Sequence, residues 1–351
     1  MYDFIGSVFK RFFQFYALKW FFWIGLWSLI SVRADYVDPT TPIGRLPAEY
    51  KLVFSDEFNG KSINRSKWNL GINERNIQNI GVDCVYCWRN VSLRNGWLVF
   101  QQDYESTPRN GAVWGDKEGV DFNYSSGGLN TEGIFYLENN MYVEICLRLP
   151  SNSGGYAAFW GMSNKKDLIV ENKVELDFFE FIASKKRRRL WSGLWWHNFL
   201  LNEVAEYVPE SDKWMVSDNH IFVKNQKHKA NIKGEINHID YDKLIKFGFL
   251  VTENKMNWFI CNDGSPLENK PYLTFNGGRV ESPSFSRWKS KNDEWVREVP
   301  NPLKSTLIIN YAMRGATWAG GPIDHDQLPA EMFVDYIRVY QFNNLFEEGV
   351  E

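Results

Sequence analysis

Three carboxylates, Glu175, Asp177 and Glu180, lie within six residues of an otherwise apolar and aromatic stretch, Val174–Phe181. The aromatic and branched residues around them favour a β-strand. A dry core would penalise three unpaired acids, because burying an ionised carboxylate costs several kcal/mol. We therefore expect this strand to line a solvated cleft.

The spacing of the acids matters because side chains alternate between the two faces of a strand. Glu175 and Asp177 then share one face, and Glu180 falls on the other unless an extra residue is absorbed between them. The pair Phe178-Phe179 suits such a β-bulge, since one ring can point inward while the extra residue takes up the other. With the bulge, the glutamate Cα atoms lie ~13 Å apart. Their side chains can then close to the ~5–5.5 Å that double displacement at an anomeric carbon requires.

Asp177 lies between the two glutamates in this arrangement. It would hydrogen-bond one of them and keep their pKa values apart. Two other interpretations of the trio stay open: three solvated acids on an exposed edge, or a calcium-binding cluster.

The composition favours a folded domain that binds a ligand through aromatic side chains. The chain has 351 residues, of which 44% are apolar, with 16 Trp and 16 Tyr. This length and apolar content can bury a large core, and the surplus of aromatic rings suits a binding surface. The net charge of -3 gives no electrostatic reason to expect a nucleic acid partner.

The N-terminus has the features of a secretory signal. Lys10 and Arg11 precede thirteen uncharged residues, 20–32, a length that suits a signal-peptide core and is shorter than a membrane span of ~20 residues. We predict that residues 1–34 are a signal peptide cleaved after Ala34, or an uncleaved signal anchor. The protein is then secreted and extracellular, or anchored as a type II membrane protein.

Other features agree with an oxidising, glycosylating compartment. Three glycosylation sequons follow the signal, at Asn64, Asn90 and Asn123. Of the four cysteines, the CxxC pair Cys84 and Cys87 is expected to form a local disulfide or to stay as free thiols, because no second Cys or His pair completes a zinc site.

Short alternating runs separated by Gly, Asn and Pro turns predict an all-β antiparallel sandwich or barrel. The strongest hairpin signal is Asn95-Gly96, between two alternating segments. We divide the chain into the signal, a lead-in at 35–50, one domain at 51–342 and an acidic tail at 343–351. The polar stretches 202–237 and 276–301 are expected to be loops. Strands are expected at the following segments: 51–55, 91–94, 97–100, 142–149, 246–251, 256–261, 306–311 and 333–340.

The carboxylate stretch resembles the bulged Glu-x-Asp-x-x-Glu signature of glycoside hydrolase family 16, the form found in laminarinases, agarases and carrageenases. Flanking segments resemble the family in the family's order: the opening strand with Asp56-Glu57-Phe58, the central hairpin from Ser126 to Pro150, the "PAFW" element at Ala157-Ala158-Phe159-Trp160, and the last strand at Val334–Tyr340. The "PAFW" element lacks its usual proline here.

This resemblance implies a concanavalin A-like β-jelly-roll sandwich of two antiparallel sheets. Glu175 would be the nucleophile, Asp177 its assistant and Glu180 the general acid/base of a retaining β-glycanase. The partner would be a polysaccharide: a β-1,3- or mixed β-1,3/1,4-glucan, or an algal galactan. A non-catalytic β-glucan-binding protein and a transglycosylase on the same site are the alternatives. We expect a monomer.

The resemblance also implies accessory residues. Expected sugar-binding residues are Trp160, Trp195, His197, Trp318 and Trp114. No cofactor is expected for catalysis. A structural calcium ion, bound by Glu57, the Gly96 carbonyl and Asp335, is expected on the face of the sandwich away from the substrate.

Overall fold

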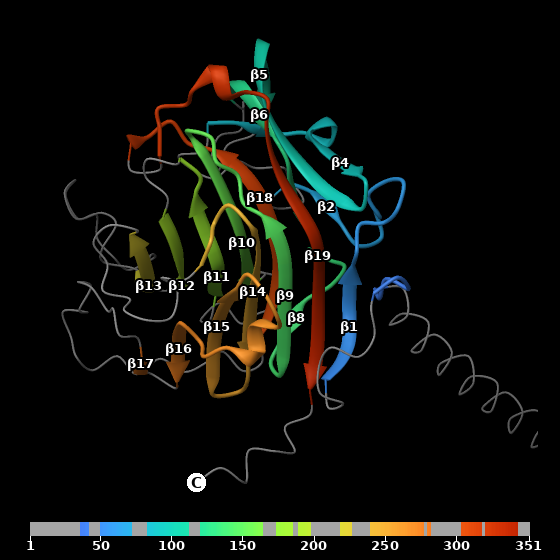
Figure 1. The fold of residues 1–351 in the computed structure, drawn as a ribbon, viewed down its shortest axis with the longest axis vertical. Coiled ribbons are helices and arrows are strands. Elements are labelled where there is room, and N and C mark those ends of the chain that lie inside the picture. Colours follow the sequence, from blue (N-terminus) through green and yellow to red (C-terminus); the bar gives the residue numbers. More distant parts are fainter. Residues whose placement is uncertain are drawn as a thin grey trace, which may run out of the picture.

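The computed structural model describes the following residues: 36–41, 50–71, 83–111, 120–163, 173–184, 189–197, 218–226, 239–276, 279–281, 303–317 and 320–342. Within them the chain is almost entirely strand, in two sheets that pack face to face (Figure 1). The all-β jelly-roll prediction is confirmed. No helix in the described part of the chain is long and apolar enough to cross a membrane.

The larger sheet contains the first and last strands of the domain, β1 and β19, which pair with each other. All its pairings are antiparallel except that of β3 with β6. In order across the sheet, its strands are β17 (Arg279–Glu281), β16 (Leu273–Asn276), β15 (Lys255–Cys261), β14 (Leu244–Val251), β9 (Met141–Arg148), β19 (Ala330–Phe342), β5 (Trp97–Gly111), β6 (Val120–Ser126) and β3 (Val85–Tyr86), with β1 (Tyr50–Asp56) beside β19 and β4 (Val91–Arg94) beside β5.

The smaller sheet carries the three acids on β11. Its strands, again in order, are β13 (Asp218–Gln226), β12 (Arg189–His197), β11 (Lys173–Ile182), β10 (Gly155–Ser163), β18 (Lys304–Met313), β7 (Gly128–Asn130) and β2 (Asn69–Leu70), with β8 (Leu137–Glu138) beside β18. Three short 3-10 helices complete the described elements: η1 (Trp88–Asn90), η3 (Pro266–Glu268) and η5 (His325–Gln327).

The main core lies between the two sheets and is lined by every second residue of their strands. A smaller buried cluster lies on the opposite, outer face of the smaller sheet. We call it the outer-face cluster; its buried members are Cys84, Tyr86, Tyr156, Ala158, Trp160, Ile182, Ile308, Ala312 and Met313. The acids of β11 lie on the same face as this cluster.

The hairpin prediction is confirmed at Asn95-Gly96. Arg94 pairs with Trp97 at the end of β4 and β5, and both turn residues have positive φ, 54° at Asn95 and 79° at Gly96. This is the left-handed geometry that a two-residue hairpin turn requires. The other predicted strands are also present, with bounds that differ from the prediction by up to three residues, except that β5 continues to Gly111.

Two predicted loops contain strands. β13 lies within 202–237 and pairs with β12, and β17 lies within 276–301 and pairs with β16. Within the described residues each is at the end of its sheet and pairs on one side only, so each needs few apolar residues, and its sequence shows little alternation. All four cysteines are free, and Cys84, Cys146 and Cys261 are buried, so the free-thiol alternative holds.

Candidate active site

The predicted β-bulge is present in β11. Asp177 pairs with Gly193 and Glu180 with Trp191, so Phe178 and Phe179 together oppose one residue of β12. Both Phe side chains belong to the main core. Leu176, before Asp177, and Phe181, after Glu180, also point into this core. Glu175, Asp177 and Glu180 therefore come to lie on the same outer face of the sheet.

The two phenylalanines of the bulge pack across the core against β14 of the larger sheet. The ring centroid of Phe178 lies 4.5 Å from that of Phe249, and the ring of Phe179 stacks on Phe247 at 4.3 Å. Each ring is almost fully buried. This packing holds both inward-pointing rings in place, which keeps Glu180 on the outer face.

The bulge also frees backbone carbonyls from regular ladder pairing, and distant side chains bond them. The indole of Trp258 on β15 donates to the Asp177 carbonyl at 2.9 Å, and the Ser192 hydroxyl donates to the Phe178 carbonyl at 2.8 Å. Tyr272 contacts Ser192 through a 2.6 Å hydroxyl pair. Buried carbonyls of this kind need a partner. Sequence reasoning missed these supporting residues, because no local signal connects them to β11.

The Glu180 carboxyl lies in a half-buried position beside two other groups. The hydroxyl of Tyr156 donates to its Oε1 at 2.6 Å, and the Arg314 guanidinium lies 4.2 Å above the Tyr156 ring. Burial raises the pKa of Glu180, the Tyr156 hydrogen bond and the Arg314 charge partly oppose this, and the Glu175 charge adds to it. The net direction is upward, which keeps a larger fraction of Glu180 protonated near neutral pH.

Trp160 lies on the predicted face, opposite Asp177, but its ring is only 6% exposed. Its indole donates to Asn310 at 2.8 Å, and Asn310 in turn donates to the Tyr86 hydroxyl at 3.1 Å. Trp160 thus forms part of the floor beneath the acids, and its ring has little free area for stacking on a sugar.

Trp191 is a residue that the sequence interpretation passed over. It lies on β12 directly opposite Glu180, is half-buried, and packs edge-on against Tyr156 at 6.3 Å between ring centroids. Aromatic rings beside a carboxylate are suited to contact sugar rings. Side chains alternate along β12, and pairing this strand with the bulged β11 puts Trp191 opposite Glu180. That register could have identified Trp191 as a site residue.

The other predicted subsite residues lie partly outside the described residues. The register of β12 brings Trp195 opposite Glu175 and His197 opposite Lys173, although the Trp195 and His197 side chains are not among the described ones. Trp114 and Trp318 lie outside the described residues. Their roles stay predictions.

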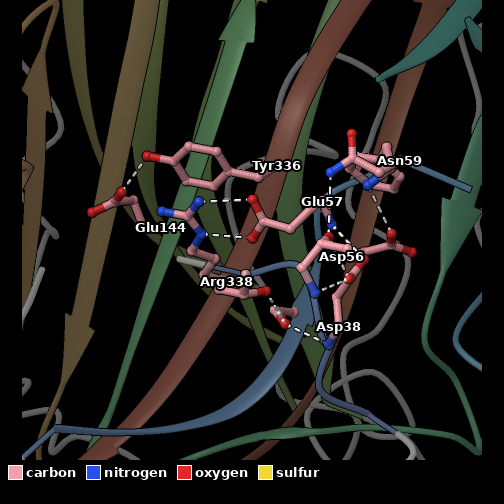
Figure 2. A network of polar contacts seen from close by, with 11 residues as sticks. Asp38, Asp56, Glu57, Asn59, Glu144, Tyr336 and Arg338 are labelled. Atoms are coloured by element: carbon pink, nitrogen blue, oxygen red, sulfur yellow. Dashed lines mark hydrogen bonds and ion pairs between the residues drawn. The ribbon is translucent and has the colours of Figure 1, made fainter. Parts of the chain in front are cut away.

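Of the three residues predicted to bind calcium, Glu57 is engaged by a neighbouring side chain. Both oxygens of Glu57 accept hydrogen bonds from Arg338, each at 2.7 Å, and both side chains are buried (Figure 2). Asp335 stands at a bulge of β19, and Gly96 lies in the β4–β5 turn beside Asn59. The described residues contain no group of three or more His, Cys, Asp or Glu side chains placed to hold a metal.

The Arg338 guanidinium also joins a larger buried network. It lies 3.6 Å from the Tyr336 ring, and Tyr336 donates its hydroxyl to Glu144 (Figure 2). Tyr142 donates to the other Glu144 oxygen at 2.9 Å. The guanidinium therefore gives Glu57, one of the residues expected to bind calcium, a fixed positive partner; the calcium site stays a prediction.

No family model matches the chain. A curated relative from Niallia circulans, glucan endo-1,3-beta-glucosidase A1, is 23% identical over 317 residues, which is 86% of this chain and 39% of the relative. The chain thus spans about two fifths of the length of that relative.

Solved structures match over nearly their full length. The endo-beta-1,3-glucanase of Pyrococcus furiosus superposes with a TM-score of 0.56 at 22% identity, covering 84% of this chain and 95% of that one. SCLam, a non-specific endo-beta-1,3(4)-glucanase from family GH16, gives 0.54 at 21% identity, with 86% and 95% covered. The resemblance to glycoside hydrolase family 16 is confirmed. At these identities the family 16 structures establish the jelly-roll fold, and the chemistry must be argued from the residues of β11.

Proposed function

We propose that the protein is a secreted, endo-acting, retaining β-glycanase of family 16 that cleaves a β-1,3- or mixed β-1,3/1,4-glucan. The observation that carries the proposal is the bulge at Phe178-Phe179, which places Glu175, Asp177 and Glu180 on one face of β11. The raised pKa of Glu180 supports its role as the acid. The glucanase relatives support a glucan over a galactan.

The first step is attack of the Glu175 carboxylate on the anomeric carbon. The bond to the leaving sugar oxygen breaks, and Glu180 donates its proton to that oxygen. A glycosyl-enzyme ester forms on Glu175, and Glu180 is left ionised. Asp177 lies between the two on the same face and orients the nucleophile.

The second step returns the enzyme to its starting state. Glu180 now takes a proton from a water molecule, whose oxygen attacks the anomeric carbon and releases Glu175. Two displacements preserve the β-configuration. If the hydroxyl of a second sugar replaces water, the same site performs transglycosylation.

A reducing-sugar assay of the purified protein on laminarin, mixed-linkage β-glucan, agarose and carrageenan tests the proposal. We expect activity on one of the two glucans, with the product released as the β-anomer in proton NMR. Glu175→Gln should lower cleavage by at least ~10³-fold, because it removes the nucleophile. Binding of the glucan should persist, since the shape of the site is kept.

Three outcomes would contradict the proposal. A Glu175→Gln variant that cleaves as fast as the native protein would remove the nucleophile assignment. Activity on agarose or carrageenan alone would move the substrate to a galactan. Binding without cleavage of any of the four polymers would favour the non-catalytic binding protein.

A further inference from the structure

Tyr156 is placed to act on the acid/base rather than on the substrate. It stands near the start of β10, two residues before Ala158, which pairs with Glu180. This spacing puts Tyr156 and Glu180 on the same face. The Tyr156 side chain is buried at 2% exposure, with Arg314 above its ring, Trp191 at its edge and its hydroxyl on Glu180 Oε1 at 2.6 Å.

The hydroxyl of Tyr156 donates to the Glu180 carboxyl in this position. Burial raises the pKa of Tyr156 well above its ordinary value, and the negative charges of Glu180 and Asp177 raise it further, while Arg314 opposes them. The phenol therefore keeps its proton at any pH at which a glycosidase works. Among the described residues, the charges that act on Glu180 are those of Arg314 and Glu175.

We propose that Tyr156 is a positioning residue that reserves one oxygen of Glu180, so that the catalytic proton is carried on the other. Oε1 already accepts the Tyr156 hydrogen bond, so protonated Glu180 carries its proton on Oε2. The same bond stabilises the carboxylate that forms once the proton has passed to the leaving oxygen. The inference rests on the proposed function and adds to it a residue outside the three acids.

Tyr156→Phe removes the hydroxyl and keeps the ring that packs in the outer-face cluster. We expect kcat/KM for laminarihexaose to fall about tenfold, because positioned general acid catalysis contributes ~10²–10⁴-fold in all. With 2,4-dinitrophenyl β-laminaribioside, whose leaving group needs no proton, kcat/KM should stay close to that of the native protein.

The pH profile gives a second readout that loss of packing would not move. Glu180 must be protonated for the first step, so kcat/KM for laminarihexaose falls as pH rises through its pKa. Loss of a hydrogen bond to the carboxylate raises that pKa. The basic limb of the Tyr156→Phe profile should therefore move up by about one pH unit.

Tyr311→Phe is the matched control. Tyr311 is a buried tyrosine on β18 that points into the main core and donates its hydroxyl to Asn152. Its removal should leave the basic limb and the leaving-group dependence unchanged. An unmoved limb in Tyr156→Phe, or equal losses on the two substrates, would overturn the inference.

Glu180→Gln separates this inference from the proposed function. The variant should lose hydrolysis of laminarihexaose and keep the first step on the dinitrophenyl substrate. If it cleaved laminarihexaose like the native protein, the acid/base assignment would fail. If it behaved as expected and Tyr156→Phe resembled the native protein, only the role of Tyr156 would fail.

Discussion

Replacing Arg338 with methionine is the sharpest test of how the larger sheet is stabilised. Arg338 is 3% exposed and Glu57 8% exposed, and two 2.7 Å hydrogen bonds join them across a separation of 281 residues in sequence. Arg338→Met keeps much of the side-chain volume and leaves the Glu57 carboxylate buried without its partner. Removing one member of a buried ion pair costs about 3–5 kcal/mol.

That cost converts to a large shift in thermal stability. Domains of ~150–250 residues lose ~2–4 °C of Tm per kcal/mol and a larger domain loses less, so Tm should fall by roughly 5–10 °C. The double variant Glu57→Gln, Arg338→Met should be more stable than Arg338→Met alone, because no charge is then left buried. Calorimetry on the four proteins of this cycle measures both effects. A Tm change of less than ~2 °C in Arg338→Met would refute the reasoning.

The same ion pair predicts the response to calcium. The guanidinium occupies both oxygens of Glu57, so Tm of the native protein should be the same in calcium chloride and in EDTA. In Arg338→Met, calcium should raise Tm, because the Glu57 carboxylate then lacks its guanidinium partner and can bind a cation in the folded state. A calcium-dependent Tm in the native protein that Glu57→Gln abolishes would show that the metal competes successfully with Arg338.

Two further predictions concern the bulge and the sequons. Deleting Phe179 removes the bulge and restores regular alternation, so Glu180 should stay on the outer face and cleavage should persist in a less stable protein that has lost the ring packed on Phe247. Phe179→Leu keeps the bulge and should also retain activity, and a folded but inactive deletion variant would contradict the alternation argument. Asn90 is 1% exposed and its amide donates to Gln101 and Asp103, so peptide mass spectrometry of the protein from a eukaryotic secretory host should find no glycan there. The exposed Asn64 and Asn123 should carry glycans, and a glycan on Asn90 would be incompatible with the structure.

The bulge could be predicted from sequence because all its determinants are adjacent. Alternation fixes which face each acid takes, and the doubled Phe178-Phe179 is the only place between Asp177 and Glu180 for an extra residue. The residues that hold the bulge could not be predicted in this way. Trp258 comes from another sheet, 81 residues further along the chain, and its bond to a carbonyl depends on how the sheets are stacked.

The ion pair of Arg338 with Glu57 could not be predicted from the sequence for a related reason. The alternating pattern of β19 identifies Arg338 as a residue of the outer face, where a solvated arginine is ordinary. Only the pairing of β1 with β19 brings the segment after β1, with Glu57, over this position and buries both groups. An ion pair between residues 281 positions apart produces no local signal in the sequence around either residue.

The inner and outer faces of the smaller sheet have different roles at the candidate active site. On the inner side, the phenylalanine rings of the bulge and the Trp258 indole fix the backbone of β11, which sets where the three acids project. On the outer side, Tyr156 and Arg314 adjust the protonation of Glu180 without altering that backbone. Substitutions on the inner side should therefore change stability and activity together. Tyr156→Phe keeps the buried ring and should change the pH profile more than it changes stability, and that contrast separates geometric control of the acids from electrostatic control.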